Sequence, residues 1–153
     1  MGAKLAIESP ESLPEIQKMV AAFQERRDLV VGGLNSIEGV TCQNPKGAFY
    51  VFPNVGGVCE ELGAVAAFDG LPDHMKAKTS PSTLLQMFLL FRYHVATLDR
   101  RSFGRIGAQG KHFLRISIAT GLDDLRAGVD RLAAAARDRE GFAAFMASGE
   151  PLY

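Results

Sequence analysis

FLRISIA, residues 113–119, is the most strand-like stretch of the sequence, and the rest of the chain can be interpreted around it. Apolar side chains alternate there with small or polar ones, which predicts Leu114, Ile116 and Ile118 on one face of a strand and Arg115 on the other. A guanidinium keeps its charge and is costly to bury without a partner. Arg115 is therefore expected to face solvent, an internal acid or the anion of a ligand, and its planar fork suits a carboxylate.

Three helices are predicted around this strand, because apolar side chains recur at helical spacing. Residues 122–136 follow the strand, and residues 80–92 open with a Ser-Pro pair. The longest predicted helix begins near Ser12 and ends at Asn35 or at Gly39. Ser12 and Glu15 have the spacing of a capping box, in which the two side chains satisfy the first free N–H groups of a helix.

The remaining strands are predicted to be short. Residues 40–43 and 48–52 flank an Asn-Pro-Lys-Gly turn, and residues 94–98 form a third candidate strand. Residues 58–68 are compatible with a short helix or an irregular cover, and residues 69–79 are predicted to be a loop. This order of elements predicts an α/β (α+β) fold, a small antiparallel or mixed β-sheet with helices packed on it.

Composition narrows the classes of function. The chain has 153 residues, the length of one domain, with 17 basic and 17 acidic side chains. A net charge of zero disfavours binding to nucleic acid, which depends on clustered Lys and Arg. No apolar run approaches the roughly 20 residues that span a bilayer, so no membrane segment is expected. The first residues do not resemble a secretory signal, and Cys42 and Cys59 fit no disulfide framework, so a cytoplasmic location is expected.

No catalytic set and no metal site is predicted from the residues themselves. His74, His94 and His112 lack the spacing of metal ligands, and neither cysteine has a flanking base. The glycine-containing stretch 104–110 precedes a strand, whereas a phosphate-binding loop precedes a helix. We therefore interpret that stretch as a connection.

Several segments in order resemble the C-terminal, or small, domain of class I/II pyridoxal-phosphate-dependent aminotransferases, of the aspartate-aminotransferase-like group with fold type I. The similarity extends from about residue 6 to about residue 137. The segments that carry it are FQERRDLV at 23–30 with Leu34-Asn35, Gly39-Val40, PKGAFYVFP at 45–53, Leu84-Leu85 through Val95-Ala96, SFG at 102–104, and LRISIA at 114–119.

The resemblance implies roles for two residues. Arg115 matches the arginine that binds the α-carboxylate of an amino-acid or 2-oxo-acid substrate, and Phe49 matches a residue that reaches toward the substrate pocket. It also implies a division into residues 1–140, the small domain, and residues 141–153, a tail compatible with one more short helix.

The resemblance further implies a cofactor and partners. Pyridoxal 5'-phosphate would be bound in the intact enzyme, which would act in amino-acid metabolism as a homodimer. The Schiff-base lysine and the other cofactor-binding groups belong to the family's large domain, and their motifs are not found in this sequence. The chain alone is therefore expected to contain no catalytic and no cofactor-binding residue, to bind no cofactor and to be inactive.

One segment departs from the family pattern. Residues 97–102 read TLDRRS, where many relatives carry a Pro-Gly pair. Arg100 or Arg101 would add positive charge beside the site or lie on the surface. The alternative to an enzyme domain is a non-catalytic ligand-binding or protein-interaction module on the same fold. The sequence does not indicate which amino acid or 2-oxo acid would be the substrate.

Overall fold

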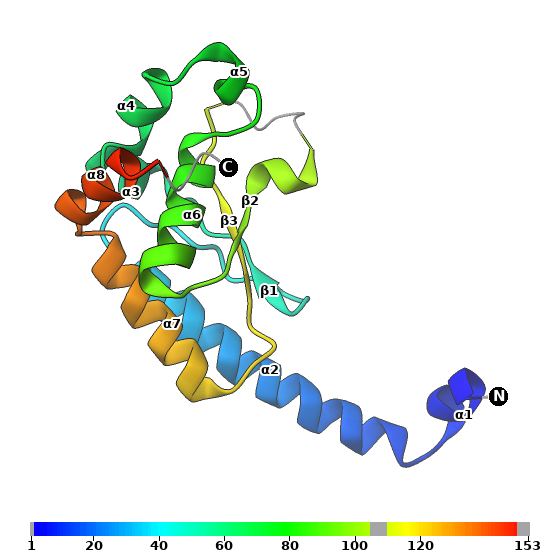
Figure 1. Ribbon diagram of the computed structural model, residues 1–153. Coiled ribbons are helices and arrows are strands. Elements are labelled where there is room, and N and C mark those ends of the chain that lie inside the picture. Colours follow the sequence, from blue (N-terminus) through cyan, green and yellow to red (C-terminus); the bar gives the residue numbers. More distant parts are fainter. Residues whose placement is uncertain (1, 105–109, 150–153) are drawn as a thin grey trace.

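The computed structural model of the chain describes residues 2–104 and 110–149 (Figure 1). Its sheet has three antiparallel strands in the order β1-β3-β2, in which β1 is Tyr50–Val51, β2 is Leu98–Asp99 and β3 is Leu114–Ser117. Helices account for most of the described residues. They are α1 (Gly2–Glu8), α2 (Ser12–Asn35), α3 (Gly56–Glu61), α4 (Ala64–Asp69), α5 (Asp73–Lys76), α6 (Pro81–Tyr93), the 3-10 helix η1 (Arg100–Phe103), α7 (Leu122–Ala135) and α8 (Arg139–Ala147). The predicted fold class, a small antiparallel sheet with packed helices, is confirmed.

The central strand β3 separates the two faces of the sheet as its sequence predicts. Leu114 and, just past the strand, Ile118 are buried, and Ile116 is half-buried. Directly paired residues of an antiparallel sheet share a face, so Val51, opposite Ile116, lies on the buried side. The other face carries Arg115.

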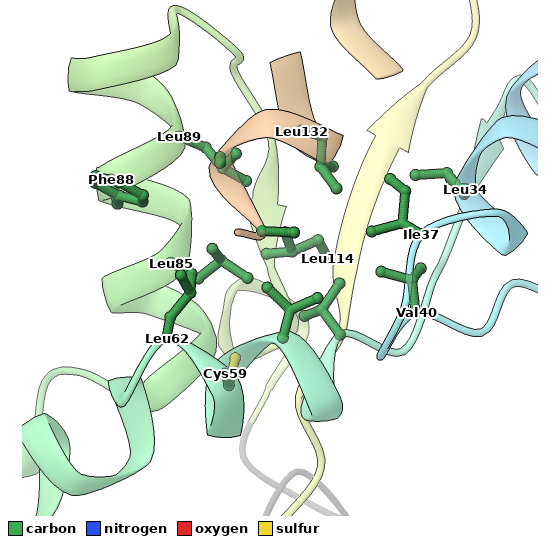
Figure 2. Close-up of a cluster of buried hydrophobic side chains, with 14 of the residues drawn as sticks. Leu34, Ile37, Val40, Cys59, Leu62, Leu85, Phe88, Leu89, Leu114 and Leu132 are labelled. Atoms are coloured by element: carbon green, nitrogen blue, oxygen red, sulfur yellow. The ribbon is translucent and has the colours of Figure 1, made fainter. Parts of the chain in front are cut away.

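The core lies between this buried face and helices α2, α6 and α7. In Figure 2, Leu114 lies at the centre of the cluster, with Leu85 from α6 on one side and Leu34 from α2 on the other. Helices α2 and α7 run side by side (Figure 1). Gly33 permits this approach, because a Cβ atom there would lie 2.7 Å from Cγ1 of Val129.

Helix α6 begins as predicted but ends in a way that shortens the following strand. The Ser80 hydroxyl accepts a hydrogen bond from the Thr83 N–H at 3.1 Å, and proline occupies the first helical position. His94 ends the helix with a left-handed backbone, φ 55°. Because the chain must turn there, the predicted strand 94–98 is wrong in extent, and pairing starts only at Leu98.

Helix α2 ends at Asn35, the first of the two predicted ends, but the predicted capping box is wrong. The helix already includes Ser12, and the Glu11 N–H donates to the Ser9 hydroxyl at 3.3 Å. Glu15 pairs instead with Lys18 at 2.7 Å. The first half of α2, together with α1, projects away from the rest of the structure (Figure 1).

The two predicted strands at 40–43 and 48–52 are mostly irregular. Only Tyr50–Val51 forms a strand, and Thr41 makes an isolated bridge to Asn54. The Asn35 side chain explains part of this result, because it bonds the backbone N–H and C=O of Cys42 at 2.8 and 2.9 Å. A side-chain amide thus replaces the partner that a strand would have provided.

Residues 58–79 contain more helix than predicted. Helices α3 and α4 are separated by Gly63, which has a left-handed φ of 79°. The predicted loop at 69–79 includes the single turn α5. Among the described residues, none of the helices combines the length and apolar character that a bilayer crossing requires.

Helix α8 closes the core from the C-terminal side. Phe142 and Phe145 are buried, and their ring centroids lie 5.3 and 5.6 Å from that of Phe88 in α6. A second link joins the same helices, because the Tyr93 hydroxyl donates to Asp138 at 2.8 Å and Asp138 in turn caps α8.

Replacing Phe145 by alanine should reduce the free energy of unfolding by about 3–5 kcal/mol, the usual range for a buried phenylalanine. Phe91, 47% exposed, provides the matched control, and its replacement by alanine should cost much less. Urea denaturation measures both changes. Equal effects of the two substitutions would show that α8 does not belong to the core.

Replacing Tyr93 by phenylalanine should change the alkaline stability of the chain. Burial, together with the hydrogen bond to Asp138, raises the pKa of Tyr93 from its usual value of 10.0 to about 12. A raised pKa means that the folded state holds this proton more tightly, so its stabilisation is complete below pH 10.0 and is lost toward about pH 12.

Unfolding curves at pH 8, 10 and 11 measure this effect. We expect the free energy of unfolding to fall less steeply with pH in the Tyr93→Phe variant than in the wild type. Parallel pH profiles would contradict the contribution of this hydroxyl.

Candidate functional site

Arg115 lies on the central strand, with aromatic side chains on either side. Its guanidinium carbon is over the Tyr50 ring of the β1 strand, 4.3 Å from the centroid, and 5.4 Å from the centroid of Phe103 in η1. Leu98 of β2 is its direct strand partner. The strands β1 and β2 and the helix η1 therefore each place one apolar side chain next to Arg115, namely Tyr50, Leu98 and Phe103.

The guanidinium retains its capacity to bind an anion. Within residues 2–104 and 110–149, no carboxylate lies at ion-pair distance from Arg115, and no hydrogen bond uses its side chain. Cation–π contacts engage the positive charge but take up no N–H donor by hydrogen bonding. Of the three surroundings considered from the sequence, an internal acid is therefore not found among the described residues.

Phe49 lies beside this arrangement. Its side chain is 50% exposed, and its ring meets that of Tyr50 edge to face, with centroids 5.6 Å apart. Its carbonyl accepts the Ile118 N–H at 2.9 Å, so the backbone of Phe49 is fixed against the end of the central strand. Both predicted site residues, Arg115 and Phe49, therefore contact the ring of Tyr50.

We define the aromatic rim as four exposed side chains next to Arg115 or to its contact Tyr50, namely the aromatic Phe49, Tyr50 and Phe103 and the aliphatic Leu98. Their exposed fractions range from 37% to 50%. Phe103 packs edge to face against Phe52, with ring centroids 6.1 Å apart, and Phe52 in turn stacks on Phe113 at 5.3 Å. An arginine with free donors inside an exposed apolar rim can hold a carboxylate and contact the carbon chain attached to it.

Three members of the rim were missed by the sequence interpretation. Tyr50 and Leu98 flank Arg115 because of the strand register, and Phe103 contacts it from the end of η1, the helix that follows β2. The SFG segment at 102–104 was part of the family resemblance but had no assigned role. The sequence does contain one signal for Tyr50. Tyr50 and Phe52 are two residues apart in a predicted strand, which places both aromatic side chains on the same face.

Arg100 and Arg101 have backbone partners outside the rim. The Arg101 guanidinium donates to the carbonyls of Lys76 and Thr79, and to that of Ala77 at 2.6 Å. Arg100 donates to the Gly104 carbonyl at 3.1 Å. Arg101 therefore fixes the segment after α5, and neither arginine contacts Arg115 or the rim in these interactions.

The two cysteines are not activated nucleophiles. Burial, together with the negative charges of Asp99 and Glu60, raises the pKa of the Cys59 thiol to about 12. Burial also raises the pKa of Cys42. In the part of the chain that the structure describes, no group of three or more His, Cys, Asp or Glu side chains could hold a metal ion.

Comparison with known proteins identifies the family. The model of aminotransferase class I and II matches residues 2–132, which is most of the chain. The chain belongs to the class I and II aminotransferase family. The aspartate aminotransferase of Rhizobium meliloti (strain 1021) is 38% identical over 130 residues, covering 85% of this chain and 28% of the relative. A probable aspartate/prephenate aminotransferase of Aquifex aeolicus is 32% identical over 131 residues, covering 86% and 28%.

Solved structures show the same relationship. A crystal structure of aspartate aminotransferase from Rhizobium meliloti matches with a TM-score of 0.62 and 34% identity, covering 86% of this chain and 29% of that one. An aromatic aminotransferase from Pyrococcus horikoshii matches with a TM-score of 0.65 and 26% identity, covering 89% and 30%. The chain therefore spans a little under a third of the length of these relatives.

The family implies pyridoxal phosphate, which requires a lysine for the Schiff base, an acid at the pyridine nitrogen and donors for the phosphate. Two lysines of this chain, Lys4 and Lys18, lie on exposed helix surfaces and pair with Glu8 and Glu15. Lysines with these neighbours do not form a cofactor site.

A second candidate for a cofactor site is a cavity of about 500 Å³ beside the start of α6, which is lined by Lys76, Lys111 and Asp69 among others. The hydroxyls of Ser80 and Ser82 in its wall donate to the Asp99 carboxylate. Arg101, also in this wall, donates to backbone carbonyls, so both serines and this arginine already have partners within the chain.

Proposed function

We propose that the chain is the C-terminal small domain of an aspartate-aminotransferase-like enzyme, in which Arg115 binds the α-carboxylate of an amino-acid or 2-oxo-acid substrate. The observation that supports this most strongly is the Arg115 guanidinium, held between aromatic rings and without an acidic partner among the described residues. A positioned cation with free donors is suited to a bidentate carboxylate contact.

The aromatic rim gives this contact its setting. Contact with Tyr50 and Phe103 restricts the arginine side chain before the ligand arrives, which lowers the ordering cost of binding. Apolar surroundings also strengthen the attraction between guanidinium and carboxylate relative to open water. Phe49, at the outer edge of the rim, would contact the substrate beyond its carboxylate.

In this proposal the chain supplies only the small domain, and a separate large domain would supply the cofactor site. Residues 1–140 would form the small domain and residues 141–153 would form a tail, and helix α8, which packs on α6, crosses this boundary. A large domain would supply the Schiff-base lysine and bind pyridoxal phosphate, and the whole enzyme would be a cytoplasmic homodimer. Closure of the small domain over the cofactor would orient the substrate and exclude water. We expect no transaminase turnover from this chain alone.

One observation favours a second function, that of a protein-interaction module. The projecting half of α2 exposes Leu13, Ile16, Met19 and Val20, with exposed fractions of 45% to 62%. An apolar surface of this kind is typical of a protein contact. In the enzyme proposal it would be covered by another part of the assembly. In the module proposal it would be the functional site.

The enzyme proposal is tested by titrating the ¹⁵N-labelled chain with succinate and following the side-chain Nε–H signal of Arg115 by NMR. Binding should be weak, on the order of millimolar, because one ion pair gives little net affinity. The Arg115→Ala variant should lose at least about tenfold in affinity, since a hydrogen bond to a charged group contributes roughly 1.5–3 kcal/mol. Arg115→Lys should fall between, because it keeps the charge but not the fork.

Arg131→Ala is the matched control, since it removes the same charge from an exposed position on α7. It should leave the dissociation constant for succinate unchanged. If Arg115→Ala binds succinate as the wild type does, the assignment of the carboxylate site is wrong. Sedimentation of the chain at increasing concentration then decides whether the α2 surface associates, as the module proposal requires.

A further inference from the structure

Asp99 is a buried acid in an unusual setting. Its side chain is 3% exposed, and it is the one charged residue counted among the buried residues of the described chain. No basic side chain of the described residues lies at ion-pair distance from it. Burial of an ionised carboxylate is costly unless other groups compensate its charge, so its contacts require an explanation.

Hydroxyl groups at the start of α6 provide that compensation. Ser82 donates to Oδ1 of Asp99 at 2.6 Å, Thr83 donates to Oδ2 at 2.7 Å, and Ser80 donates to Oδ2 at 3.3 Å. The carboxylate thereby sits at the N-terminus of a 13-residue helix, where the helix dipole favours negative charge. In addition, the Asp99 backbone N–H donates to Oε1 of Gln86 at 2.8 Å. Helix α6 and its N-cap residue Ser80 thus hold residue 99 through four hydrogen bonds.

The position of Asp99 in the chain connects this anchor to the carboxylate site. The preceding residue, Leu98, pairs with Arg115 across the sheet. The following residues form η1, whose N–H at Arg100 donates to the Phe113 carbonyl at 3.0 Å and whose last residue, Phe103, contacts the Arg115 guanidinium. Residue 99 is therefore the junction between the two segments that flank Arg115 on the β2 side.

We infer that Asp99 is a positioning residue for the carboxylate site: by fixing the start of η1 to α6, it keeps Phe103 against the Arg115 guanidinium. This inference rests on the proposed function of Arg115 and concerns the segment at 97–102, in which the sequence departs from the family pattern. Asp99 itself makes no ligand contact in this account, because its carboxylate is on the buried face of the sheet and Arg115 is on the other.

The test is a double-mutant cycle in the full chain with Asp99→Asn, Phe103→Ala and the combined variant, using succinate as the ligand and NMR as the readout. Asp99→Asn keeps the shape of the side chain and removes its charge. It should weaken succinate binding by about two- to five-fold, the range expected for one exposed cation–π contact, and should abolish the nuclear Overhauser effects between Phe103 and Arg115. Asp130→Asn, an exposed acid on α7, is the matched control for charge and should change neither readout.

The cycle separates a positioning role from a general loss of structure. If Asp99 acts through Phe103, the Asn substitution should cause no additional loss of affinity in the Phe103→Ala background. Full additivity of the two losses would overturn the inference, and so would persistence of the Phe103–Arg115 contacts in Asp99→Asn.

Two further outcomes have defined meanings. If Asp99→Asn does not fold, Ser82→Ala removes one donor to the carboxylate and should give the same changes in smaller size, and its failure to do so overturns the inference. If the wild type does not bind succinate, the proposed function fails, while the Phe103–Arg115 contacts still report on Asp99.

Discussion

The alternation of side chains along β3 is the constraint on which the rest of the structure depends. Leu114 and Ile118 must point into the core, because they lie in the cluster formed by α2, α6 and α7. Arg115 must then point to the opposite face. A slip of one residue would bury the guanidinium and expose the leucine, so the hydrophobic core itself fixes the register that presents Arg115. The site is in this sense a consequence of packing on the other side of the sheet.

The sequence predicted those parts of the fold that depend on local periodicity. Helices α2, α6 and α7 were predicted because their apolar spacing covers several turns, and β3 because its alternation is clear. The errors lie where one side chain intervenes. Asn35 takes the hydrogen bonds of Cys42 that a strand would have used, and His94 turns the chain by adopting a left-handed backbone. No periodic pattern contains such information.

The candidate site was predictable to a similar degree. Arg115 stood out because a permanent charge in an apolar strand requires an explanation, and the family resemblance then gave it a role. The rim was not predictable, since Tyr50, Leu98 and Phe103 come near Arg115 through register and through the path of η1. The hydrogen bonds of Asp99 were not predictable for the same reason, because its hydroxyl donors lie 16 to 19 residues earlier in the chain.

The central claim is that the Arg115 guanidinium is a preformed carboxylate site bounded by aromatic rings. The most direct measurement is a crystal structure of the chain soaked with succinate. The account predicts a carboxylate at hydrogen-bonding distance from the Arg115 guanidinium nitrogens, with Tyr50 and Phe103 still in contact with the guanidinium. A succinate bound elsewhere while Arg115 pairs with an acid of its own chain would contradict it.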